Sequence, residues 1–146
     1  MARPLATTIA MVLLAAVAAY GAEVSAALVQ PALDIQVALA SDVMDNVQQN
    51  AALVEAEAVR LGPPAARIAG AARQLTKTRK IEDARVAFGA MSEAIVAYMD
   101  AQKLSPASGV RVAFCPMVKK PWLQKDGELR NPYYGRAMLT CGSFQK

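Results

Sequence analysis

The chain has 146 residues, of which 55% are hydrophobic, which suffices for one small domain with a core and argues against disorder over most of its length. The formal net charge is +4, and there is no histidine. A nucleophile activated by histidine and a histidine-rich zinc site are therefore excluded. The cysteine spacings of redox and haem motifs and the glycine-rich phosphate motifs are also absent, so the protein is not expected to be an enzyme.

Residues 1–26 have the pattern of a secretory signal peptide, with Arg3 ahead of an apolar run over residues 5–20. The run is shorter than the roughly 20 residues that a transmembrane helix needs, and small residues predict cleavage after Gly21 or Ala26. An uncleaved membrane anchor is the alternative. The alanine-rich style suggests a bacterial protein, so we expect a periplasmic location and no membrane span in the mature chain.

The positive charge is concentrated in the C-terminal part of the chain. Residues 27–102 carry 7 basic and 9 acidic side chains, whereas residues 103–146 carry 8 basic and 2 acidic ones. The basic residues of this tail are scattered rather than clustered, which is typical of a solvated surface. Nucleic acid is therefore not an expected partner.

Apolar residues recur at steps of three, four or seven over residues 28–61, which is the stripe of an amphipathic helix. Pro31 indicates that the regular helix begins at or after it, and Ser41 with Asp42 can cap a fresh helix. The segment is therefore one long helix or two collinear pieces. Gly62 and the two prolines after it end this segment and start the next helix.

Two further helices are expected, over residues 65–75 and 81–103, from the same apolar spacing. Acidic residues in the first turn of the longer one favour its N-terminus there. Three or four such helices form a small antiparallel bundle. The predicted fold class is therefore all-α, with the helical bundle over residues 27–104.

Residues 105–146 are predicted to be a loop-rich segment packed on the bundle, after a linker rich in serine, proline and glycine. Residues 110–114 alternate weakly and favour a short extended piece. A single helical turn is expected over residues 133–139, which would present Met138 and Cys141 on the same side.

Each of the two cysteines has a methionine close to it in the sequence: Met117 follows Cys115, and Met138 precedes Cys141. Thiolates with thioethers are a soft ligand set, suited to Cu(I) and Ag(I) and poorly suited to Mg, Ca or Mn. The first hypothesis is therefore a monovalent soft-metal site formed by these four residues.

A disulfide is the alternative for the cysteines, because an even pair in an oxidising compartment is often bonded. Closing the loop from Cys115 to Cys141 would contribute roughly 3 to 4 kcal/mol in the chain-entropy model. In that case the protein is a structural or interaction module that docks on a periplasmic partner. A reduced pair binds metal, and an oxidised pair cannot offer thiolates.

Trp122, the sole tryptophan, has two interpretations. It is an aromatic residue that closes the end of the bundle, or it is a lid on the metal, where an indole face beside a soft cation would exclude water. Met44, Met91 and Met99 lie in or beside the helical stripes and are expected to pack in the core.

A set of residues in the tail and the preceding helix carries a family resemblance. These are Cys115-Pro116-Met117, Trp122-Leu123-Gln124, Asn131-Pro132-Tyr133-Tyr134-Gly135, Met138, Cys141-Gly142, and in the helix Asp83-Ala84-Arg85, Phe88 and Met91-Ser92. They resemble a bacterial domain family of formerly unknown function. The family occurs alone in the periplasm and at the C-terminus of the periplasmic adaptor subunits of copper and silver efflux pumps.

The resemblance implies a helical bundle with an appended metal-binding segment and a role in copper or silver handling. It implies Cys115, Met117, Met138 and Cys141 as ligands, with a turn shaped by Asn131, Pro132, Tyr133 and Gly135. It also implies efflux-pump or other periplasmic copper proteins as partners. This chain departs from the family where a histidine or tyrosine often precedes the first cysteine, since it has phenylalanine there, and its spacer before the tryptophan is shorter. It also lacks an adaptor's other domains and resembles the stand-alone version.

Overall fold

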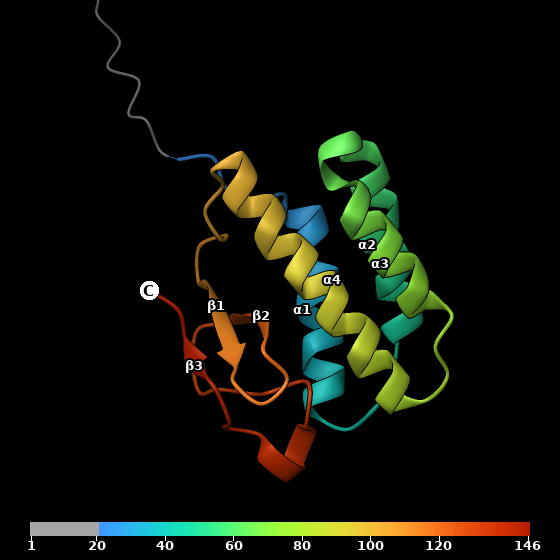
Figure 1. Cartoon of the computed structure of the whole chain (residues 1–146), viewed down its shortest axis with the longest axis vertical. Helices are drawn as coiled ribbons and strands as arrows, with labels where there is room; N and C mark the ends of the chain where they lie inside the picture. The colour runs from blue at the N-terminus through green and yellow to red at the C-terminus, as the bar shows by residue number, and fades with distance from the viewer. Residues whose placement is uncertain (1–20) are drawn as a thin grey trace, which may run out of the picture.

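Helices form the larger part of the molecule in the computed structural model, which describes residues 21–146 (Figure 1). Each helix packs against the one that follows it, and α4 also contacts α1. No helix in this part of the chain is long and apolar enough to cross a bilayer. The helices are α1 (Ala26–Ala40), α2 (Val47–Leu61), α3 (Ala66–Thr76) and α4 (Ile81–Gln102), with a short 3-10 turn, η1 (Pro63–Ala65), before α3.

The apolar stripe of residues 28–61 forms two helices that pack against one another, so a single long helix or two collinear pieces is wrong. The chain reverses between α1 and α2 through a turn in which Asp42 and Asn46 adopt positive φ angles of 60° and 57°. These two residue types tolerate the left-handed conformation better than most. The stripe therefore continues on both sides of a sharp turn, and its spacing alone does not reveal the break.

Helix α1 begins at Ala26, ahead of Pro31, which lies buried inside the helix. The expectation that the helix begins at or after this proline is wrong. Val29 and Leu33, on either side of it, are buried in the core. The free energy gained by burying these side chains offsets the loss of the backbone hydrogen bond that a proline cannot make.

The predictions for the third and fourth helices are confirmed. The helix expected over residues 65–75 is α3, and the one expected over residues 81–103 is α4. Met91 and Met99 are buried on the inner face of α4, as their spacing indicated. Gly62 has a φ of 82° and ends α2, which is the role that its position predicted.

The expected all-α class is wrong, because residues 105–146 form a three-stranded antiparallel sheet beside the helices (Figure 1). The extended piece expected over residues 110–114 is its central strand. The other two strands were not predicted from the sequence. One begins with Lys120-Pro121, and the other has only two residues. The strands are β1 (Val110–Cys115), β2 (Lys120–Lys125) and β3 (Ser143–Phe144), in the order β2-β1-β3.

The sheet shares one core with the helices. Strand β2 packs against α4 and α1, and it places Trp122 and Leu123 in the buried cluster. Trp122 has no exposed surface and is among the largest fully buried side chains of the described residues. The tail is therefore folded onto the bundle as a part of the domain.

The start of α1 and the end of α4 are joined by backbone hydrogen bonds. Val24 N donates to Ser105 O at 3.0 Å, and Ser105 N donates to Ala22 O at 3.0 Å. Val24 is 3% exposed and belongs to the core. Most of the predicted signal peptide, residues 1–20, lies outside the described residues.

Candidate metal site

The structure brings the two cysteines together. Cys115 is the last residue of β1, and Cys141 lies two residues before β3. Strand β3 pairs with β1 so that Phe114 lies opposite Ser143. This register brings the two cysteines close enough for Cys115 to raise the pKa of Cys141, and both cysteines are free. Residues far apart in the sequence thus form one thiol pair.

The two thiols differ in their surroundings. Cys115 has no exposed surface, whereas Cys141 is partly exposed. Burial is the main factor that raises the pKa of Cys141, and the adjacent Cys115 raises it further. Since a neutral thiol must lose its proton to become a metal ligand, any ion that binds here displaces protons.

The two methionines of the predicted ligand set lie nearer the surface. Met117 is in the turn between β1 and β2 and is 60% exposed. Met138 ends a short 3-10 helix, η2 (Gly135–Met138), and is 37% exposed. Cys141 N donates to Met138 O at 3.0 Å, so these two residues share one turn. Among the four predicted ligands, the structure therefore brings Cys141 close to Cys115 and joins it to Met138 through the backbone.

Asn131 builds the loop that carries Cys141. Its side chain is fully buried, its Nδ2 donates to Cys141 O at 2.7 Å, and its Oδ1 accepts from Tyr133 N at 2.8 Å. Its backbone N also donates to Leu139 O at 2.7 Å. An asparagine can serve both as donor and as acceptor in this way, which an aspartate at neutral pH cannot.

Trp122 lies beneath the loop that carries Cys141. Its ring meets Tyr133 edge to face, with centroids 6.0 Å apart and planes at 85°. Its Nε1 donates to Gln124 Oε1 at 3.1 Å, so the indole N–H has a hydrogen-bond partner inside the core. The side of the six-membered ring lies against Gly142, next to Cys141. Trp122 thus packs as a core residue, and a role as a lid on a metal ion remains a prediction.

An ion-pair cluster next to η2 was not expected from the sequence. Arg85 Nη2 donates to Asp42 Oδ1 at 2.6 Å, and Arg136 Nε donates to Asp42 Oδ2 at 3.0 Å. Hydrogen bonds from Arg85 and then from Arg136 lower the pKa of Asp42 to about 2. These residues come from the α1–α2 turn, α4 and η2, so no local spacing signals their meeting. Gly135 is the nearest hint in the sequence, since its φ of 57° lies in the region that glycine adopts most readily.

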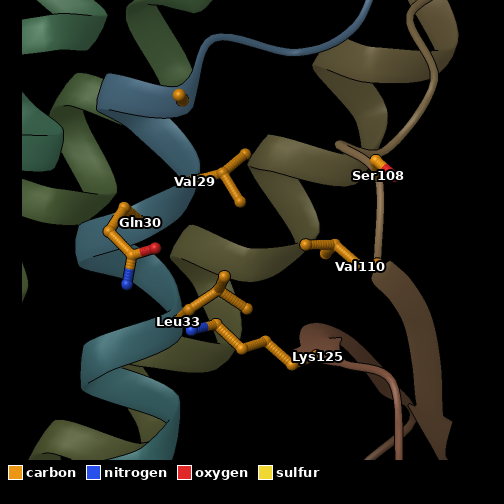
Figure 2. Close-up of a pocket in the computed structure, with 8 residues that line it drawn as sticks. Val29, Gln30, Leu33, Ser108, Val110 and Lys125 are labelled. Atoms are coloured by element: carbon orange, nitrogen blue, oxygen red, sulfur yellow. The ribbon is translucent and has the colours of Figure 1, made fainter.

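Two hollows on the surface lie away from the thiols. One, of about 320 Å³, lies between α1 and the chain that leads into β1, and Figure 2 shows Val29, Leu33 and Val110 around it, with Lys125 close by. The other, of about 380 Å³, lies between α4 and the tail, where Gly89 leaves room beside Tyr133. Neither hollow is lined by a sulfur atom.

Over residues 21–146 there is no group of three or more histidine, cysteine, aspartate or glutamate side chains that could hold a metal ion. Such groups are typical of zinc, magnesium and calcium sites. Two cysteines and two methionines do not form such a group, because it would need at least three histidine, cysteine, aspartate or glutamate side chains. The predicted donor set would therefore suit a soft monovalent ion better than any of these divalent ions.

Comparison with known proteins adds no assignment: no family model, no curated protein and no solved structure matches the chain.

Proposed function

We propose that this protein is a periplasmic soft-metal binding protein, which holds Cu(I) or Ag(I) through Cys115 and Cys141 and buffers or delivers the ion. Met117 and Met138 complete the ligand set. The observation that carries the proposal is that the fold of the tail brings two free cysteines, 26 positions apart in the sequence, close to one another. The sequence resemblance described above supports the same chemistry.

The surroundings of the thiol pair suit a soft ion. Cys115 is fully buried and Cys141 partly so, which limits the access of water and oxidants to a bound ion. Two thiolates and one monovalent cation carry a net charge of about −1, and the segment around them holds 8 basic and 2 acidic residues. Met117 and Met138 are exposed, and the flexible methionine side chain can change rotamer to approach the ion.

The second candidate function rests on the same proximity of the two cysteines. An oxidant would convert the two thiols into a disulfide, which would fix β3 and the loop before it to β1. The protein would then be a structural or interaction module whose surface docks on a periplasmic partner. The two functions exclude one another in any single molecule, because a disulfide offers no thiolate.

A competition experiment with a chromophoric Cu(I) chelator on the reduced protein tests the proposal. We expect one Cu(I) per chain and a large loss of affinity in a Cys115→Ser, Cys141→Ser double variant. Met117→Leu and Met138→Leu should each weaken binding much less, because the thiolates neutralise the ion. Zn(II) should compete poorly, since the site lacks histidine and four thiolates.

Met44→Leu is the matched control, because Met44 is partly buried beside the helices and belongs to no predicted site. It should bind Cu(I) as the parent does. If the double cysteine variant retains the parent affinity, the soft-metal function is wrong. Thiol counting on protein isolated from the periplasm, with and without added copper, then decides between the two candidates.

A further inference from the structure

We propose that Asp42 and Arg85 are positioning residues for the thiol site, because with Arg136 they form a clamp that fixes the turn carrying Met138 and Cys141. This set of three residues is called the Asp42 clamp below. The inference rests on the proposed function for its metal readout, and its effect on the thiols is independent of metal.

Arg85 joins three parts of the chain. Its Nη2 donates to Asp42 Oδ1 at 2.6 Å and to Leu39 O at 2.9 Å, at the end of α1. Its Nε donates to Pro132 O at 2.9 Å, in the loop before η2. The Arg85 side chain is only 16% exposed, and its donors bond to groups within the protein. A guanidinium presents these donors in a rigid plane, which a lysine ammonium does not.

Asp42 holds η2 from the other side of the clamp. Its Oδ2 accepts from Arg136 N at 3.1 Å and from Arg136 Nε at 3.0 Å, so one carboxylate bonds both the backbone and the side chain of η2. Charge-assisted hydrogen bonds of this kind are stronger than those between neutral groups. The first half of η2 is therefore tied to the α1–α2 turn.

Gly135 packs directly against the Asp42 clamp, with no room for a side chain at this position. A Cβ at residue 135 would overlap the Asp42 carboxylate and would lie 2.5 Å from Arg85 Nη2. Its φ of 57° is also one that most side chains rarely adopt. The clamp and η2 are thus in direct contact, so a displacement of one must displace the other.

The clamp reaches the predicted ligands through short backbone connections. Gly135 N donates to Asn131 O at 3.1 Å, and Cys141 N donates to Met138 O at 3.0 Å. Asn131 in turn holds Cys141 O through its side chain. Met117 lies in the β1–β2 turn and shares none of these connections. The clamp should therefore act on Met138 and Cys141 and leave Met117 unaffected.

Two variants test the clamp from opposite sides. Asp42→Asn removes the charge that both arginines share, and Gly135→Ala pushes a methyl group into the clamp without altering any charge. Each should weaken Cu(I) binding by about 10- to 100-fold, the usual effect of losing a residue that orients metal ligands. Each should also increase the rate at which a disulfide reagent modifies the thiols of metal-free protein, because Cys141 loses its fixed turn.

Glu55→Gln is the matched control. It breaks another charge-assisted pair, Arg73 Nε to Glu55 Oε1 at 2.7 Å, between α2 and α3 and away from the tail. It should leave both the Cu(I) affinity and the thiol reactivity at the parent values. Far-ultraviolet circular dichroism should show the same helix content in all variants, because the buried apolar core keeps the helices folded when the clamp is weakened.

A double-mutant cycle separates positioning from a general loss of structure. Asp42→Asn and Met138→Leu should be less than additive in their effect on Cu(I) affinity, whereas Asp42→Asn and Met117→Leu should add. Equal coupling to both methionines, or parent-like thiol rates in both clamp variants, would overturn the inference. If the parent itself binds no Cu(I), the proposed function fails, and the thiol rates still decide whether the clamp positions Cys141.

Discussion

Gly142 lies against the indole of Trp122, so closely that a Cβ at residue 142 would come within 2.8 Å of ring atom Cη2 and of Phe114 O. Its φ of 144° is also one that side chains rarely adopt. The residue after Cys141 therefore has to be a glycine. Because the tail passes directly over a buried core residue, the place of Cys141 depends on how the core is packed.

Removal of the indole should destabilise the whole domain. We expect Trp122→Ala to lower the free energy of unfolding by roughly 3 to 5 kcal/mol, since the side chain is fully buried. Urea denaturation followed by far-ultraviolet circular dichroism measures this change. Leu53→Ala is the control, because Leu53 is 57% exposed and should change the free energy by about 0.5 kcal/mol or less. Similar effects of the two substitutions would contradict the placement of Trp122 in the core.

Binding of Cu(I) should strengthen as the pH rises. Burial, and then the adjacent Cys115, raise the pKa of Cys141, so the thiol is protonated near neutral pH and the ion must displace its proton. The apparent affinity should rise by about tenfold per pH unit for each proton released. Chelator competition from about pH 6 to about pH 9 measures this slope. Cys141→Ser should make it shallower, and a pH-independent affinity would show that no thiol proton is displaced.

The protein should lose stability in acid as two carboxylates become protonated. Hydrogen bonds from Arg85 and then Arg136 lower the pKa of Asp42 from 3.8 to about 2, and bonds from Arg60 are the main cause that lowers the pKa of Glu57 from 4.5 to about 2. Both groups bind protons more weakly in the folded protein than in the unfolded chain. They therefore stabilise the fold above their ordinary pKa values, and this stabilisation is lost as the pH falls toward about 2.

Urea midpoints measured between about pH 5 and about pH 2 test this acid dependence. Asp42→Asn and Glu57→Gln should each be less stable than the parent at pH 5 and should approach it at pH 2. Glu55→Gln, at an exposed ion pair, should follow the parent more closely. If the difference between parent and variants grows as the pH falls, the sign of the argument is wrong.

The mature protein should begin at Ala22. Of the two cleavage positions that the sequence allows, the one after Gly21 preserves the contacts of the segment before α1: Val24 is buried, and Ser25 Oγ donates to Glu57 Oε1 at 2.6 Å. Cleavage after Ala26 would remove both. Intact-mass measurement of the protein recovered from the periplasm decides between the two positions.

A chain that is expressed from Ala27 onward provides the matching comparison. It lacks the buried Val24 side chain and the hydrogen bonds to Ser105, so it should unfold at a lower temperature than a chain that begins at Ala22. Equal thermal stability of the two chains would remove the structural reason for choosing Gly21.

The helical segments were predictable because each buries a regularly spaced apolar face, whereas the start of α1 and the sharp turn between α1 and α2 were not. Phe88, Met91 and Ile95 follow the helical period on α4, and all are at most 1% exposed. The sheet was not predictable in this way. Pro121 lies opposite Phe114 on the edge strand β2, a position where a proline is tolerated, and the three successive buried residues of β2 hide the alternation that marks a strand.

The meeting of the cysteines was predictable as a hypothesis, because each has a methionine beside it and the pair is the only one in the chain. The Asp42 clamp was not. Asp42 and Arg136 are 94 positions apart, and charged residues at a predicted helix cap and in a predicted helical turn are ordinarily solvated. Their pairing follows from the tertiary fold, which brings the α1–α2 turn and η2 to one place.

The unequal burial of Cys115 and Cys141 makes the two ends of the proposed site kinetically different. A competing thiol that approaches a bound ion meets the Cys141 side first, because Cys115 has no exposed surface. Ligand exchange would then proceed in a fixed order, with Cys141 displaced first and Cys115 released last. An acceptor protein would therefore need to reach only one face of the domain, and the ion would pass to it without being released into water.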